Sequence, residues 1–139
     1  MLSLSIQADA LRRYPAGKIA YKKGNLLVWR WDVKPSPLSS FYTIKMVYRL
    51  GSLPKVYVIS PMPLTLAKGK TSLPHVYSTE EQQICLFYND EDNGREWGPD
   101  RIIANTIVPW IAEWLYFYEI WLYTGVWTGG GIHGGKIEK

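Results

Sequence analysis

Cysteine and histidine are scarce in this sequence. Its 139 residues include one cysteine, Cys85, and two histidines, His75 and His133. One cysteine excludes an internal disulfide. The three side chains together are also a poor supply for a tetrahedral zinc site, which needs four ligands or three plus a water. We therefore expect neither a disulfide framework nor a bound metal.

Charge of one sign forms no long run in this sequence. The chain has 16 Lys and Arg against 12 Asp and Glu, a net charge of +4, without a long run of one sign. It lacks the concentrated basic stripe of a duplex binder, so we expect no nucleic-acid partner. The glycine-rich tail, residues 125–139, lacks the lysine–serine/threonine ending of a phosphate-binding loop and follows a predicted helix instead of preceding one. No cofactor is predicted.

We expect neither a signal peptide nor a membrane span. Polar residues interrupt the N-terminus, where a signal peptide requires a continuous apolar core. Residues 102–127 are more apolar, but they include Glu113 and Glu119. A carboxylate near the bilayer centre costs about 2.5 to 3.5 kcal/mol on insertion scales. We expect a buried helix there, no membrane partner and a cytoplasmic protein.

Aromatic residues, in contrast, are abundant. The chain has 7 Trp and 10 Tyr, and hydrophobic residues make up 47% of it against 20% charged. This balance is typical of a globular protein and not of a disordered one. The length suits one core, so we expect residues 1–139 to form a single domain that ends in the glycine-rich tail.

Periodicity predicts a helix followed by an antiparallel meander. Apolar residues recur at helical spacing over 2–14, and Pro15 ends the helix. Strands are predicted over 25–33, 42–50 and 56–59, joined by short turns. The basic residues at the end of the helix and in the following turn form either a solvated face or a docking surface for an acidic partner. They are Arg12, Arg13, Lys18, Lys22 and Lys23.

Helical periodicity returns near Asp100, directly after Pro99. Pro109 is expected to break or kink this helix at Val108, because its ring removes a hydrogen bond and clashes with the preceding turn. A second helical segment, up to Tyr123, is apolar almost all round and should pack on the sheet. Its apolar stripe comprises Ile111, Trp114, Leu115, Tyr118 and Leu122. The elements together predict an α+β fold.

Residues 73–99 contain the side chains that could take part in a reaction. On residue chemistry alone, Cys85 is either a buried core cysteine or a thiolate nucleophile that carries an acyl group as a thioester. A papain-like Cys–His arrangement with His75 or His133 is a minor alternative, because no protease signature surrounds the cysteine.

An acidic loop follows the cysteine. Asn89 begins it, and Asp90, Glu91 and Asp92 come next. Carboxylates nearby argue against a strongly depressed thiol pKa, because they disfavour a second negative charge. They suit a different role, which is to steer an attacking lysine ammonium and help it to lose its proton.

The order of elements resembles the ubiquitin-conjugating (UBC-like) fold, with an N-terminal helix, an antiparallel β-meander and C-terminal helices packed on the sheet. Those enzymes carry a His-Pro-Asn motif upstream of a cysteine in an Ile-Cys-Leu setting, and then a Trp-x-Pro before a helix. Here the corresponding segments are Leu73-Pro74-His75-Val76-Tyr77, Ile84-Cys85-Leu86 and Trp97-Gly98-Pro99.

More closely, the chain resembles the small bacterial conjugating-enzyme-like proteins of antiphage (CBASS) operons, in the short form that lacks an activating-enzyme domain. These proteins are encoded beside a CD-NTase, a cyclic-oligonucleotide synthase. The segments behind this resemblance are Tyr57-Val58-Ile59-Ser60-Pro61, Leu73-Pro74-His75-Val76-Tyr77, Thr106-Ile107-Val108-Pro109-Trp110, Glu113-Trp114-Leu115, Tyr118-Glu119-Ile120-Trp121-Leu122 and Gly129-Gly130-Gly131-Ile132-His133.

The resemblance implies transfer chemistry. Cys85 would accept the C-terminal carboxyl of the CD-NTase as a thioester and pass it to an amine, with the loop from Asn89 to Asp92 facing that amine. His75 replaces the asparagine of the eukaryotic motif, and it either donates a hydrogen bond to the developing oxyanion or braces the loop. Three further residues support the motif, namely Pro74, Tyr77 and Trp97. The alternative is a non-catalytic binding module of the same fold that holds the synthase.

Overall fold

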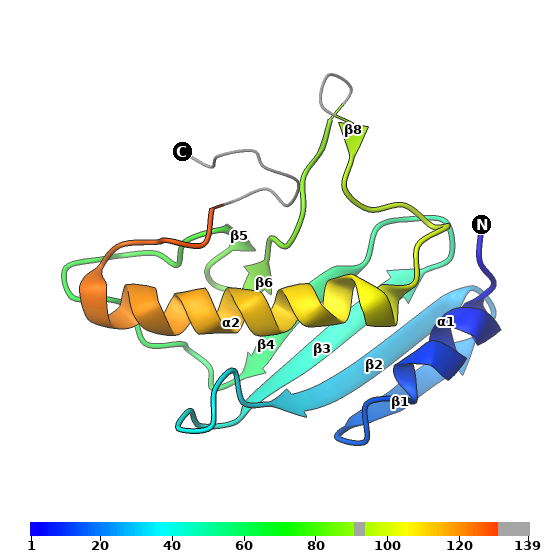
Figure 1. Ribbon diagram of the computed structural model, residues 1–139, viewed down its shortest axis with the longest axis horizontal. Coiled ribbons are helices and arrows are strands. Elements are labelled where there is room, and N and C mark those ends of the chain that lie inside the picture. The colour runs from blue at the N-terminus through cyan, green and yellow to red at the C-terminus, as the bar shows by residue number, and fades with distance from the viewer. Residues whose placement is uncertain (91–93, 131–139) are drawn as a thin grey trace.

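The computed structural model describes residues 1–90 and 94–130, with Asp90 described by its backbone alone. It confirms an α+β architecture in which one long helix lies across one face of an antiparallel sheet (Figure 1). The helices are α1 (Leu4–Leu11), the 3-10 turn η1 (Ile103–Asn105) and α2 (Ile107–Thr124). The strands are β1 (Gly17–Lys23), β2 (Leu26–Val33), β3 (Tyr42–Arg49), β4 (Lys55–Ser60), β5 (Val76–Ser78), β6 (Gln83–Ile84), β7 (Asn89–Asp90) and β8 (Gly94–Arg95).

The main sheet has six strands in the order β1-β2-β3-β4-β6-β5, and every pair is antiparallel. The predicted meander is present as β2, β3 and β4. Alternation along these strands places one set of side chains against α2, and the register pairs Trp29 with Met46 and Trp31 with Ile44. All four are buried, so they form the sheet's contribution to the core.

The meander begins one strand earlier than expected. Residues 17–23, predicted as a basic turn, form β1 at the edge of the sheet. Two features hide this strand in the sequence: a register shift between Ile19 and Tyr21 breaks the alternation, and lysines, which are common on edge strands, occupy its exposed positions. Position 17, the first of this strand, requires glycine, because a Cβ there would lie 2.5 Å from the Trp29 ring.

Helix α1 is shorter than the predicted 2–14. Ser3 caps it, and its hydroxyl accepts a hydrogen bond from the Ile6 N–H at 3.2 Å. The buried Gln7 joins α1 to η1: its amide donates to the Arg101 carbonyl at 2.8 Å and accepts from the Ile103 N–H at 2.9 Å. This polar residue fixes the two elements relative to each other, since both halves of its amide are satisfied in the core.

The predicted break at Pro109 is wrong. Helix α2 begins at Ile107 and continues to Thr124 without interruption. Pro109 is its third residue, within the first turn, where backbone N–H groups have no partner inside the helix and a missing one costs nothing. The helix expected near Asp100 is likewise replaced by coil and the 3-10 turn. Residues 94–130 therefore contain one α-helix, not the two expected.

The predicted apolar stripe of α2 does face the core. Ile111, Trp114, Leu115 and Tyr118 are buried, whereas Leu122 is only partly buried and Trp121 is buried in addition. The helix ends one residue after the predicted Tyr123, and Gly125 caps it in the left-handed conformation at φ 76°, with its N–H bonded to the Trp121 carbonyl at 2.7 Å. Within residues 1–90 and 94–130, no helix combines the length and the apolar character needed to cross a membrane.

Candidate functional site

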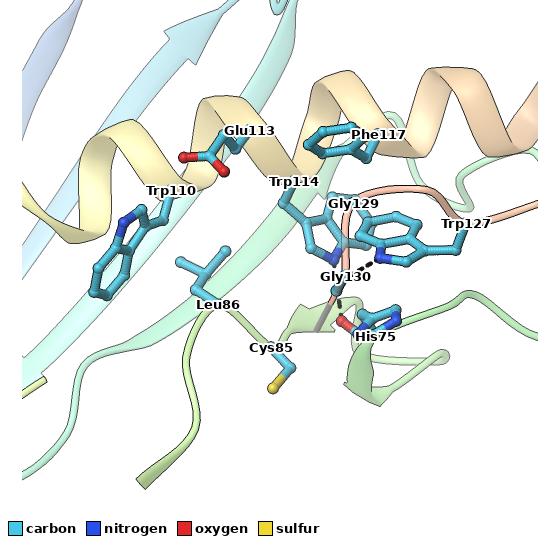
Figure 2. Close-up of a pocket in the computed structure, with 10 residues that line it drawn as sticks. All are labelled: His75, Cys85, Leu86, Trp110, Glu113, Trp114, Phe117, Trp127, Gly129 and Gly130. Carbon is cyan, nitrogen blue, oxygen red and sulfur yellow. Dashed lines mark hydrogen bonds between the residues drawn. The ribbon is translucent and has the colours of Figure 1, made fainter. Parts of the chain in front are cut away.

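Cys85 lies directly after β6, the short strand between β4 and β5 (Figure 1). Its neighbours Ile84 and Leu86 are buried, but the cysteine itself is only partly buried. Its N–H donates to the His75 carbonyl at 2.9 Å, and its Sγ lies 3.6 Å from the Phe87 carbonyl oxygen. The buried neighbours thus anchor the strand end, and the thiol points away from α2 (Figure 2).

His75 stands beside Cys85 on the β5 side. Its backbone has φ 48°, a left-handed conformation that is uncommon for a residue other than glycine. Its carbonyl accepts hydrogen bonds from the Cys85 N–H at 2.9 Å and from Trp114 Nε1 at 3.0 Å. Its ring is stacked on Trp127, with centroids 4.7 Å apart and planes at 24° (Figure 2). Both the backbone and the ring of His75 are therefore held by other residues.

Tyr77, two residues further along, also meets the cysteine. Partial desolvation and a hydrogen bond to Cys85 raise the pKa of the Tyr77 phenol above its ordinary value, although the residue as a whole is 63% exposed. A tyrosine phenol is already protonated at physiological pH, and the raised pKa extends its neutral form to higher pH. Tyr77 thus places a neutral hydroxyl beside the thiol. Pro74, the other residue of this motif, precedes His75 and is partly buried.

Asn89 braces the base of the loop after the cysteine. Its Oδ1 accepts from the N–H groups of Glu96 at 2.8 Å and Trp97 at 3.2 Å, and its Nδ2 donates to the Trp97 carbonyl at 2.9 Å. Trp97 is fully buried, and its indole N–H donates to Thr106 Oγ1 at 3.0 Å, next to the start of α2. The hydrogen bonds of Asn89 and Trp97 thus attach this loop to the start of α2.

The acidic residues of this loop are described only in part. Asp90 belongs to β7, which pairs with β8 in a small hairpin, but its side chain is not described. Glu91 and Asp92 lie outside the described residues, as does His133. The proposed steering of an amine by these carboxylates therefore stays a prediction. The described residues include no group of three or more His, Cys, Asp or Glu side chains placed to hold a metal ion.

A small pocket with a cavity volume of about 40 Å³ opens beside Cys85 (Figure 2). Three structural units build it, namely the β5–β6 region, the outward side of α2 and the segment after α2. Its lining residues are His75, Cys85, Leu86, Trp110, Glu113, Trp114, Phe117, Trp127, Gly129 and Gly130. The pocket wall is mainly aromatic, and the thiol lies at its rim.

Sequence reasoning missed part of this pocket. It assigned Trp114 and the other aromatic residues of α2 to the core and left the segment after α2 as structureless coil. The available signal was Trp127, a large apolar side chain placed directly before a run of glycines. Such a residue needs a surface to pack on. The structure supplies that surface as His75, Trp114 and Phe117.

The fold and the pocket together define an α+β protein that presents a single partly exposed thiol at the end of its sheet. The family model of the Type II CBASS E2 protein matches residues 7–134, and the chain belongs to that family, E2-CBASS. This confirms the resemblance read from the sequence. Membership gives the protein an E2-like role in CBASS defence and implies a partner within the CBASS operon. No curated protein matches the chain.

Proposed function

We propose that this protein has the ubiquitin-conjugating (UBC-like) fold and carries the C-terminus of a CD-NTase as a thioester on Cys85, passing it to an amine. One observation carries the proposal. The only cysteine of the chain is partly exposed at the rim of a pocket, although the residues on either side of it are buried. A cysteine that serves packing alone would favour the interior, where free cysteine usually lies.

The chemistry requires an activated carboxyl group, as an acyl adenylate or another thioester. The Cys85 thiolate attacks the carbonyl carbon, the adenylate or thiol departs, and a thioester bond to Sγ remains. An amine then attacks the thioester, loses its proton and forms an amide, and the Cys85 thiol is released. Tyr77 supports the first step, because a neutral phenol beside the sulfur can donate a hydrogen bond to the thiolate.

His75 has two candidate roles in this scheme. Its ring lines the pocket beside Cys85, where an imidazole N–H can donate to the oxyanion that forms as the carbonyl is attacked. Its carbonyl meanwhile braces the Cys85 backbone at 2.9 Å. Truncation to alanine separates these roles, because the carbonyl remains and only the ring is lost. Slower thioester formation by His75→Ala, with unchanged stability, supports the oxyanion role.

Intact mass spectrometry tests the function. The protein purified with its neighbouring CD-NTase should give an adduct whose mass is the sum of the two chains less one water, and a thiol reductant such as dithiothreitol should cleave it by thiol exchange. Cys85→Ser should give a reductant-resistant ester or no adduct, and Cys85→Ala none. An adduct that survives reductant in the wild-type protein, or none in the presence of an activated donor, would contradict the thioester.

A non-catalytic binding module is the alternative. It is favoured by the amount of bracing around the site, since Asn89, Trp97 and the His75 carbonyl are engaged in structural hydrogen bonds. This alternative predicts tight association with the CD-NTase that Cys85→Ala leaves unchanged, together with no thiol-dependent adduct. Calorimetric titration of wild type and Cys85→Ala with the CD-NTase distinguishes the two functions when combined with the mass measurement.

A further inference from the structure

Residues 127–130, here called the tail segment, return from the end of α2 to the Cys85 pocket. Gly125 reverses the chain at φ 76°, and the segment then runs back toward β5 (Figure 1). Trp127 enters a set of rings, with centroids 4.7 Å from His75, 5.8 Å from Trp114 and 6.1 Å from Phe117. These contacts join the tail segment to both the helix and the candidate catalytic residue.

The tail segment is also fitted to α2 through its backbone. Trp127 Nε1 donates to the Gly130 carbonyl at 2.5 Å and closes a tight turn over the two residues between them (Figure 2). A Cβ at Gly129 would lie 2.6 Å from two Phe117 ring atoms. This separation is too short for any side chain. Glycine at this position therefore allows the backbone to form the pocket wall.

His75 is held at three points by these contacts. The Cys85 N–H and the Trp114 indole fix its carbonyl, whereas Trp127 is stacked on its ring. The first two contacts do not set the ring's orientation, because they act on the backbone. Stacking with planes at 24° does set it.

We propose that Trp127 is a positioning residue for the thioester chemistry, which orients the His75 ring, while the tail segment forms one wall of the pocket beside Cys85. This inference rests on the proposed function. It assigns a role to a segment that periodicity left without structure, and it predicts that truncation after α2 impairs the reaction while Cys85 stays intact. The bonds that change are those of the proposed function: the donor's acyl carbon loses its bond to the leaving thiol and forms a bond to the Cys85 Sγ.

Transthioesterification tests the proposal with the full-length protein. The probe is the C-terminal peptide of the neighbouring CD-NTase as a benzyl thioester. Acyl transfer to Cys85 releases benzyl mercaptan and needs no activating enzyme. We expect Trp127→Ala to lower the rate at saturating peptide at least about tenfold, since small misplacements of a catalytic group cost this much or more. Trp127→Phe, which keeps a stacking ring, should recover most of the rate.

Two controls separate positioning from folding and from thiol exposure. Tyr123→Ala removes another aromatic side chain from the same end of the chain, 86% exposed and outside the pocket, and should leave the rate unchanged. Alkylation of Cys85 by iodoacetamide should differ little between wild type and Trp127→Ala. His75→Ala combined with Trp127→Ala should be no slower than His75→Ala alone, because both changes remove the same interaction.

A spectroscopic readout makes the inference independent of turnover. The His75 ring protons should be shifted upfield in NMR by the Trp127 indole, a shift lost in Trp127→Ala and retained in Trp127→Phe. An unchanged shift in Trp127→Ala, or rate losses in the two single variants that add in the double variant, would overturn the positioning role. A wild-type protein that does not react with the peptide overturns the proposed function, while the ring shift still decides whether Trp127 holds His75.

Discussion

The two sides of α2 differ in what they contact. On the sheet side, Ile111, Leu115 and Tyr118 are almost completely buried in the core. On the other side, Trp110 and Phe117 are only partly buried and line the pocket beside Cys85. One helix thus supplies both the core and a wall of the site. Most of its stabilising burial comes from one side, because stabilisation follows the apolar area removed from water.

Trp114 belongs to both sides. It is 3% exposed, and its ring is stacked on Tyr118 with centroids 5.6 Å apart and planes at 4°. Its indole N–H nevertheless holds the His75 carbonyl at 3.0 Å and its ring lines the pocket. Trp114 therefore contributes both to the core and to the pocket beside Cys85.

The largest effect on stability is expected from Trp114→Ala. Removing a buried tryptophan from the stripe should lower the free energy of unfolding by about 3 to 5 kcal/mol. Urea denaturation monitored by circular dichroism measures this change. Phe117→Ala is the matched control on the pocket side, and should cost clearly less because the side chain is only partly buried. Equal losses in the two variants would mean that the two sides of the helix do not differ as proposed.

The buried side of α2 could be predicted from sequence, but its beginning could not. Apolar residues at helical spacing indicate the stripe without reference to any other part of the chain. Whether Pro109 breaks the helix depends on where the first turn starts, and the start follows Thr106, whose hydroxyl accepts from Trp97 and donates to the Ile102 carbonyl at 2.8 Å. Such a tertiary contact leaves no periodic signal.

Part of the candidate site could also be predicted from sequence, and part could not. The motif resemblance placed His75, Tyr77 and Cys85 together, and the β5–β6 pairing brings them to one place. Trp127 was not predicted, because its contact with His75 joins two irregular segments far apart in the chain. Loop-to-loop contacts of this kind follow neither a two-residue nor a 3.6-residue period.

Glu119 offers a second test, at a place on α2 remote from Cys85. Its carboxylate accepts hydrogen bonds from Ser39 Oγ at 2.6 Å and Tyr42 Oη at 2.7 Å, which attach the β2–β3 connection to the helix. Glu119→Ala should lower the free energy of unfolding by about 1 to 3 kcal/mol, because the buried Tyr42 hydroxyl loses its partner. Thermal denaturation measures the loss.

Glu119→Ala should leave the chemistry unchanged. The pocket beside Cys85 does not include Glu119, so the rate of acyl transfer from the peptide thioester is expected to equal that of the wild type below the unfolding transition. Glu119→Gln, which keeps one acceptor oxygen, serves as the milder control. A loss of transfer rate in Glu119→Ala at full folding would show that α2 couples its two ends, and the separation of stability from function would fail.

Tyr42→Phe should give the smallest effect at neutral pH, about 1 kcal/mol for one hydrogen bond. The difference in stability between wild type and Tyr42→Phe should change at alkaline pH. Burial, and then the hydrogen bond and charge of Glu119, raise the pKa of Tyr42 above its ordinary value of 10.0. The unfolded chain therefore releases this proton at a lower pH than the folded chain does, so stability falls as pH rises above about 10.

Tyr42→Phe removes that proton from both states, and the stability of the variant should depend less steeply on pH in this range. Urea denaturation of both proteins at pH 8 and at higher pH, with concentrations matched, measures the two slopes. Identical slopes would mean that the Tyr42 phenol titrates alike in the folded and unfolded chain. The Glu119 end of the helix would then be more exposed to water than its hydrogen bonds indicate, and in this respect it would resemble the pocket side.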